Sequence, residues 1–256
     1  MSYRIQNRQS GAVLIVVLIM LVLVTLVGTW AIRGSIISLK IATNAQAQAL
    51  LKQTSDSVFF TLENKTDDEL AYANMRIGDG MLNYVLRPEN SGKELVFCIR
   101  GGTSDHFEGS NISSVVYWVD EDTIRNTDNG TNGFCKVDRL SDFLSGRNAV
   151  MTQVTVRPIS NDRDWEHMME GDDKESSKST GIQKVAITAT SILPNLSDAS
   201  SSDINSCLKN YTSFVDPVLA ESNTPNETVT DCLSGKNVPY STQQMEYTMK
   251  TVGASS

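Results

Sequence analysis

The sequence lacks the residue groups on which most enzyme and metal sites are built. It has only two histidines among 256 residues, and its four cysteines never form a C-x-x-C pair. It also contains no G-x-S-x-G nucleophile motif, no G-x-x-x-x-G-K-[ST] phosphate loop and no H-E-x-x-H zinc motif. We therefore expect a protein that is not an enzyme and has no catalytic residues, cofactor or zinc.

Clustered basic residues are scarce as well. The chain carries 22 Lys and Arg against 30 Asp and Glu, a formal net charge of −8. Binding to a phosphate backbone requires grouped Lys and Arg, so no nucleic-acid partner is predicted. Acidic groups at residues 120–122, 162–164 and 172–173 could offer oxygen ligands to calcium, but none has the spacing of an EF-hand loop. Calcium binding therefore stays an open question.

One long apolar segment is present, at residues 12–32, and it carries no charge. About 20 apolar residues are enough for an α-helix to cross a bilayer. A signal peptide has a shorter apolar region that is followed by a small-residue cleavage site. Here the small residue, Gly11, comes before the apolar segment and ends a basic leader. Cleavage there would remove residues 1–11 and leave a membrane-spanning helix on the mature protein.

The helix is predicted to continue into water as far as Leu62. Residues 41–62 contain no Pro or Gly and are rich in strong helix formers. Within them an apolar stripe recurs at steps of three and four, and we expect it to pack on a globular head; its members are Leu51, Ser55, Val58 and Leu62, with Phe59 beside them. Gly28 and Gly34 are either points where the helix bends or sites of close helix packing.

Residues 63–256 are predicted to form the head, as strands separated by polar loops. Five segments are rich in β-branched or aromatic residues: Glu94–Arg100, Ser114–Asp120, Val150–Arg157, Gln183–Leu193 and Gln244–Val252. Their alternation indicates an antiparallel sheet with one buried face, which the helix stripe would cover. The expected fold class is α+β.

Two further segments of the head stand apart from the strands. Residues 160–180 are strongly charged and predict a long exposed loop, in which Trp165, Met168 and Met169 either contact a partner or pin the loop to the head. Residues 194–240 are rich in Ser, Asn, Asp and Thr and predict a loop-rich C-terminal region.

The four cysteines all lie in the head, and their even number suits an oxidising compartment such as the periplasm. Four cysteines allow three connectivities. We favour Cys98 with Cys135 and Cys207 with Cys232, because each pair closes a local loop and the second would hold the loop-rich C-terminal region together.

The leader end, Arg8-Gln9-Ser10-Gly11, and the run AVLIVVLIML that follows it resemble the class III leader and helix start of type IV pilins, and most of all the PilX-like minor pilins. The resemblance is confined to the N-terminal segment. It implies a pilin fold and a prepilin peptidase that cuts between Gly11 and Ala12 and methylates the new N-terminus. Most pilins have a glutamate at the fifth position after the cut, where this chain has Val16.

The resemblance also implies a function. A PilX-like minor pilin spans the inner membrane once with its head in the periplasm and then moves to the pilus tip at the cell surface. There it primes pilus assembly, contacts other minor pilins and the major pilin through its helix, and carries a PilY-type adhesin, so that it serves twitching and cell adhesion.

Two alternatives remain. The first is the K-type tip pseudopilin of a type II secretion system, which also lacks the glutamate but usually has a larger, helical head. The second is an enzyme or receptor domain on a simple membrane anchor. Such a protein would keep Met1 and the leader.

Overall fold

The computed structural model describes residues 10–101, 107, 109, 112–120, 123–144, 147–159, 182–215 and 227–250. The chain divides into two compact units, residues 1–47 and residues 48–256. The first unit holds the N-terminal part of one long helix. The second, the head, holds the end of that helix together with a sheet and several short helices.

The long helix α1 (Ser10–Asp67) begins and ends slightly beyond its predicted bounds. It contains no proline, and it is unbroken at Gly28 and Gly34, where an added Cβ would meet nothing within 4 Å. The helix ends at Asp67. The next residue, Asp68, has an extended backbone, and its carboxylate accepts hydrogen bonds from the amides of Leu70 and Ala71 in the next helix, α2 (Glu69–Arg76). Asp68 therefore closes one helix and caps the other.

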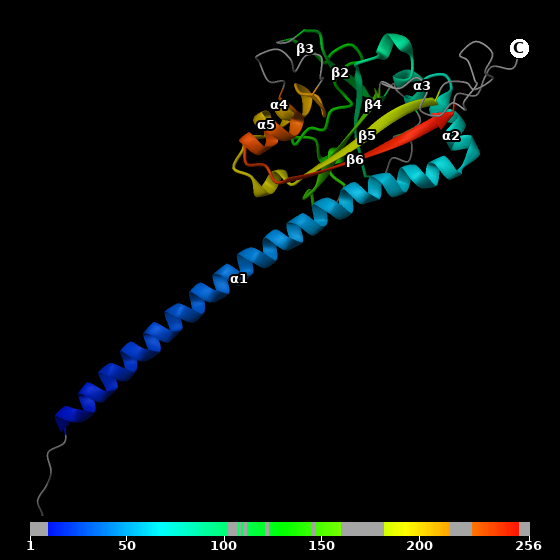
Figure 1. The fold of residues 1–256 in the computed structure, drawn as a ribbon. Coiled ribbons are helices and arrows are strands. Elements are labelled where there is room, and N and C mark those ends of the chain that lie inside the picture. The colour runs from blue at the N-terminus through cyan, green and yellow to red at the C-terminus, as the bar shows by residue number, and fades with distance from the viewer. Residues whose placement is uncertain are drawn as a thin grey trace, which may run out of the picture. The chain divides into compact units, whose positions relative to one another are not determined.

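The head is built on one six-stranded antiparallel sheet (Figure 1). The order across the sheet is β3-β2-β1-β4-β5-β6. The strands are β1 (Glu94–Cys98), β2 (Ser114–Trp118), β3 (Ile124–Arg125), β4 (Met151–Ile159), β5 (Ile182–Ile192) and β6 (Tyr240–Lys250). All five predicted strands form, β3 is additional, and β6 begins earlier than its predicted start at Gln244. The predicted α+β fold is confirmed.

One face of the sheet packs on the C-terminal part of α1. Every member of the predicted stripe is buried, and none is more than 3% exposed. The short helices α2 and α3 (Met81–Val85) close the same core. Its sheet residues alternate along the strands and include Leu95, Phe97, Val154, Val156, Val185 and Ile187. The stripe therefore covers the sheet as the sequence predicts.

A line of buried hydroxyl groups crosses this interface. Ser55 Oγ of α1 lies 2.8 Å from Ser191 Oγ of β5, which in turn lies 2.7 Å from Thr152 Oγ1 of β4. All three residues are fully buried. Each hydroxyl can donate one hydrogen bond and accept others, so the line can satisfy itself without water. Because a shift of one helical turn would leave buried hydroxyls unpaired, these bonds fix the register of α1 on the sheet.

The opposite face of the sheet is also covered, and here the prediction of a single buried face is wrong. Val96 and Val116 point to this face and are fully buried. A second core lies at one end of it and contains α4 (Ser201–Lys209), α5 (Val229–Gly235) and both disulfides. The predicted loop-rich region thus contains two helices, which lie together at one end of the sheet (Figure 1).

Candidate functional site

The N-terminal half of α1 presents an apolar surface on every side. No side chain from Val13 to Ile32 carries a charge, and the large apolar ones range from 49% exposed at Val22 to 80% at Trp30. Within the described residues one helix, α1, is both long enough and apolar enough to cross a membrane. A helix without a polar face suits lipid or a bundle of similar helices.

The few hydroxyl groups of this segment are satisfied within the helix. Thr25 donates to the carbonyl of Val22 at 2.9 Å, Thr29 to that of Leu26 at 2.8 Å, and Ser35 to that of Ala31 at 3.0 Å. In hydrocarbon an unpaired hydroxyl is costly. These residues therefore need no partner subunit in order to lie in a membrane.

The predicted processing residues lie at the start of α1, whose helical backbone begins at Ser10 and includes Gly11 and Ala12. Val16 follows about one turn later and is 56% exposed. No acidic residue occurs in the first turn, and none follows as far as Ile32. The helix start therefore has no carboxylate at or near position 16, where most pilins have a glutamate.

Both disulfides join the cysteines that the sequence analysis paired. Cys98 is bonded to Cys135 and Cys207 to Cys232, with 37 and 25 residues of sequence separation. All four belong to or pack against the second core, and no cysteine is free. The bridge between Cys207 and Cys232 joins α4 to α5 and so closes the C-terminal region on itself.

Buried polar residues, which sequence reasoning missed, hold the C-terminal region to the sheet. The Gln153 amide donates to the carbonyl of Leu208 at 2.8 Å and accepts from the amide of Cys135 at 3.1 Å. Glu94 has no exposed surface, and its carboxylate accepts hydrogen bonds from the amide and hydroxyl of Ser213. Burial raises the pKa of Glu94 from its ordinary value of 4.5 to about 7. These two side chains are the polar anchors of the region.

A third buried polar residue, Asp142, organises the loop beside the first disulfide. Its fully buried carboxylate pairs with the Arg100 guanidinium at 2.7 Å and accepts from the amide of Lys136 at 3.0 Å. The Cys98 sulfur lies 3.7 Å from the Asp142 carbonyl oxygen. Asp142 therefore ties the loop to the end of β1.

The candidate partner contacts Trp165, Met168 and Met169 lie outside the described residues, as does the predicted loop at residues 160–180. Their role remains a prediction.

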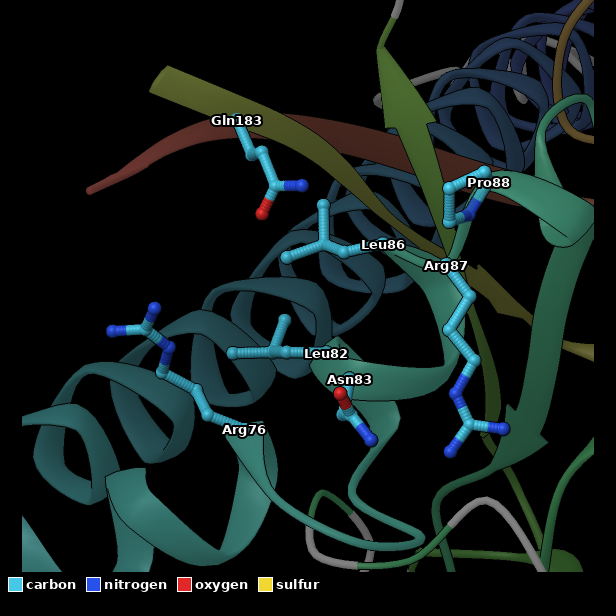
Figure 2. A pocket seen from close by; sticks show the side chains of 7 residues that line it. All are labelled: Arg76, Leu82, Asn83, Leu86, Arg87, Pro88 and Gln183. Atoms are coloured by element: carbon cyan, nitrogen blue, oxygen red, sulfur yellow. The ribbon is translucent and has the colours of Figure 1, made fainter. Parts of the chain in front are cut away.

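A shallow hollow of about 250 Å³ lies beside α2, α3 and the start of β5. Figure 2 shows Leu82 and Leu86 at its centre and the arginines Arg76 and Arg87 on opposite sides. Arg87 and Asn83 both donate to the Gly78 carbonyl, at 3.1 and 2.6 Å, so their polar ends are used to hold the neighbouring turn. The hollow is smaller than most ligand pockets, which span about 300–1,000 Å³. Among the described residues no group of His, Cys, Asp or Glu could hold a metal.

Comparison with known proteins identifies the N-terminal helix. A family model described as PilX N-terminal matches residues 10–60, which is α1 from its first residue through most of the buried stripe. No curated protein and no solved structure matched the chain. The matched segment starts an apolar helix, and that helix packs on an antiparallel sheet in a head with two disulfides. Residues 10–60 are therefore similar to the N-terminal segment of the PilX-like minor pilins of type IV pili.

Proposed function

We propose that this protein primes the assembly of type IV pili and stays at or near the pilus tip. Before assembly it spans the inner membrane through residues 12–32, with residues 63–256 in the periplasm. The observation that carries the proposal is Val16, an apolar residue in a helix start that has no carboxylate as far as Ile32.

The physical basis is the cost of a charge in lipid. A carboxylate in the hydrocarbon core is expensive unless it is paired. In pilins that have the glutamate, it is thought to pair with the free N-terminal amine of the neighbouring subunit, which helps a new subunit to dock beneath an existing one. A subunit with Val16 has no carboxylate to offer to a subunit above it. After cleavage it still has an amine at Ala12 for a subunit below, which suits the top of a filament.

The partners follow from this position. The apolar part of α1 contacts other minor pilins and the major pilin. The head binds a PilY-type tip adhesin, with Trp165, Met168 and Met169 as candidate contacts. The prepilin peptidase acts on the precursor between Gly11 and Ala12.

Processing is tested by intact-mass and N-terminal analysis of the protein purified from its native membranes. A mature chain that begins at Ala12 with one added methyl group supports the proposal. A chain that retains Met1 and the leader would contradict it and leave a single-pass anchored domain.

Position in the pilus is tested with Val16→Glu, with Val17→Glu as the matched control. Both variants place one carboxylate at nearly the same depth of the helix, but only the first restores the position that pilins use. We expect Val16→Glu to move the protein from the tip into the shaft, which raises its copy number in sheared pili. Val17→Glu should not do so. Unchanged copy number and unchanged assembly in Val16→Glu would count against the tip position.

The second candidate function is the K-type tip pseudopilin of a type II secretion system, because that subunit also lacks the glutamate. Deleting the gene separates the two functions. Loss of pili and of twitching supports the minor pilin, whereas loss of enzyme secretion with pili intact supports the pseudopilin.

A further inference from the structure

The last strand of the sheet, β6, has a neighbouring strand on one side only. It lies at the border of the sheet beyond β5, and Figure 1 shows it in red. The opposite border is β3, which has two residues, whereas β6 has 11. Proteins usually protect a long border strand from pairing with other chains by Lys, Pro or a bulge. Residues 241–248 contain no Pro, Gly or Lys, and their register with β5 is unbroken. We call the side of residues 241–248 that faces away from β5 the open edge.

The backbone groups of the open edge follow from the hydrogen bonds of the sheet. The Leu193 amide donates to the Pro239 carbonyl at 3.0 Å, and these two residues continue the register of β5 with β6. In an antiparallel pair every second residue bonds to the neighbouring strand, and the residues between them direct their amide and carbonyl groups the other way. The outward-directed residues are Thr242, Gln244, Glu246 and Thr248. Among the described residues, none supplies a hydrogen-bond partner to their backbone on that side.

The side chains along the open edge differ between the two faces of the sheet. Toward α1 lie Met245, which is 42% exposed, and Tyr247, which packs on the core. Tyr247 also lines a hollow of about 210 Å³ together with Leu62 and Tyr72. On the other face the four outward-directed residues are polar and exposed, and Glu246 is the single charged side chain from residue 241 to residue 248. A strand placed here would therefore meet apolar groups on one face and polar groups with one carboxylate on the other.

We propose that the open edge is a docking site for an extended strand of a partner protein, which adds to the sheet beside β6. The row of outward amides and carbonyls selects an extended backbone, because only a strand presents matching groups at the same spacing. The side chains select the sequence. Alternate residues of the added strand are apolar and lie against Met245 and Tyr247, and the residues between them are polar, with Lys or Arg opposite Glu246. The inference concerns the head alone and holds wherever the protein lies in a pilus.

A second copy of β6 fits the open edge less well than such a partner. Full overlap of two antiparallel copies would place each Glu246 opposite Gln244 of the other copy. The two Glu246 carboxylates would then lie on neighbouring pairs of the same face, where like charges repel. The charge of the open edge therefore favours a cationic partner strand over self-pairing.

Peptide binding to the full-length protein in detergent micelles tests the proposal. The probe is a labelled nine-residue peptide in which Val at every second position alternates with Thr, with one Lys at the centre. The control peptide has the same composition in an order without alternation, and micelles without protein give the background. By fluorescence anisotropy the alternating peptide should bind at least about tenfold tighter than the control, because burying one Val side chain already corresponds to about that factor.

Gln244→Pro and Gln244→Thr test whether the peptide adds at the open edge. The Gln244 amide faces away from β5, so proline there removes an outward donor and no hydrogen bond of the sheet. Both variants lose the weak bond from the Thr188 hydroxyl to the Gln244 side chain, which makes them a matched pair. Gln244→Pro should weaken binding of the alternating peptide about tenfold, and Gln244→Thr less than about threefold.

Glu246→Lys keeps the test decisive if Gln244→Pro does not fold, which near-UV circular dichroism would reveal. This exposed change should lower the affinity for the Lys peptide about 2- to 5-fold and raise the affinity for a peptide with Glu at its centre. Equal affinity for the alternating and control peptides, or no binding above the micelle background up to about 1 mM, would overturn the proposal. So would unchanged binding in Gln244→Pro or in Glu246→Lys. A wild-type dimer in sedimentation that Gln244→Pro abolishes would assign the open edge to a second copy and would also overturn it.

Discussion

Replacing Phe59 by alanine tests whether the packing of α1 on the sheet holds the head together, and the next residue supplies the control. Phe59 is 2% exposed and lies in the core, whereas Phe60 is 67% exposed. Removing a buried Phe side chain costs about 3–5 kcal/mol, because the lost transfer free energy adds to that of the cavity. An exposed substitution usually changes the free energy of unfolding by less than about 0.5 kcal/mol.

The assay is thermal unfolding of the full-length protein in detergent micelles, followed by near-UV circular dichroism, which reports tertiary packing in the head. In a domain of 150–250 residues each kcal/mol shifts Tm by about 2–4 °C. Phe59→Ala should therefore lower Tm by roughly 6–20 °C, and Phe60→Ala by less than about 2 °C. Small shifts in both variants would show that the stripe does not hold the head. Large shifts in both would show that α1 packs through a different face.

Three further changes probe the head by denaturant unfolding. Replacing Cys207 and Cys232 by alanine should cost about 3.5 kcal/mol, because the bridge closes a loop with a separation of 25 residues, and reductant should then have less effect on the variant than on the wild type. Asp142→Asn removes the buried 2.7 Å ion pair with Arg100 and should cost about 3 kcal/mol, and an unchanged midpoint would contradict the role assigned to Asp142. Gly133→Ala would place a Cβ against the backbone of β1 and of the residues entering β2, and it should lower the free energy of unfolding by at least about 1–3 kcal/mol. An unchanged free energy of unfolding would contradict the close contact between Gly133 and these strands.

The elements that could be predicted are those whose signal is local. The long helix follows from a charge-free segment and from helix formers that no proline interrupts. The stripe from Leu51 to Leu62 has the period of a helix, and the strand at Val185 alternates with the period of a sheet. In each case the residues that form the pattern are close in sequence, so no knowledge of distant contacts is needed.

The two helices of the C-terminal region have local sequence signals, but the amino-acid composition of the region does not reveal them. In α4, Ile204, Cys207 and Leu208 have helical spacing and are buried, and Ser200 caps the helix by accepting from the amide of Asp203. In α5 a capping box joins Thr228 to Asp231. A segment rich in Ser, Asn and Thr can therefore be helical where its few apolar residues share one face.

Glu94 could not have been identified from the sequence. It begins an apolar strand, where a carboxylate is usually exposed, and its burial depends on Ser213, which is 119 residues away. The same holds for Gln153 and its partner Leu208, 55 residues apart. The second face of the sheet is buried because of these long-range contacts. The alternation of residues within one strand does not reveal which distant segment will cover that strand.

The division of α1 into two kinds of surface makes the proposed assembly role separable from folding. The core of the head uses α1 only from Leu51 onward, and Val16 belongs to the other unit of the chain. The N-terminal part of the helix is apolar on every side, so it has no polar or charged face that could specify where a neighbouring subunit docks. The residue type at one position along the helix, such as residue 16, can specify the docking position instead. Val16→Glu should therefore leave the Tm of the head unchanged while it changes the place of the protein in the pilus, whereas Phe59→Ala should lower the Tm.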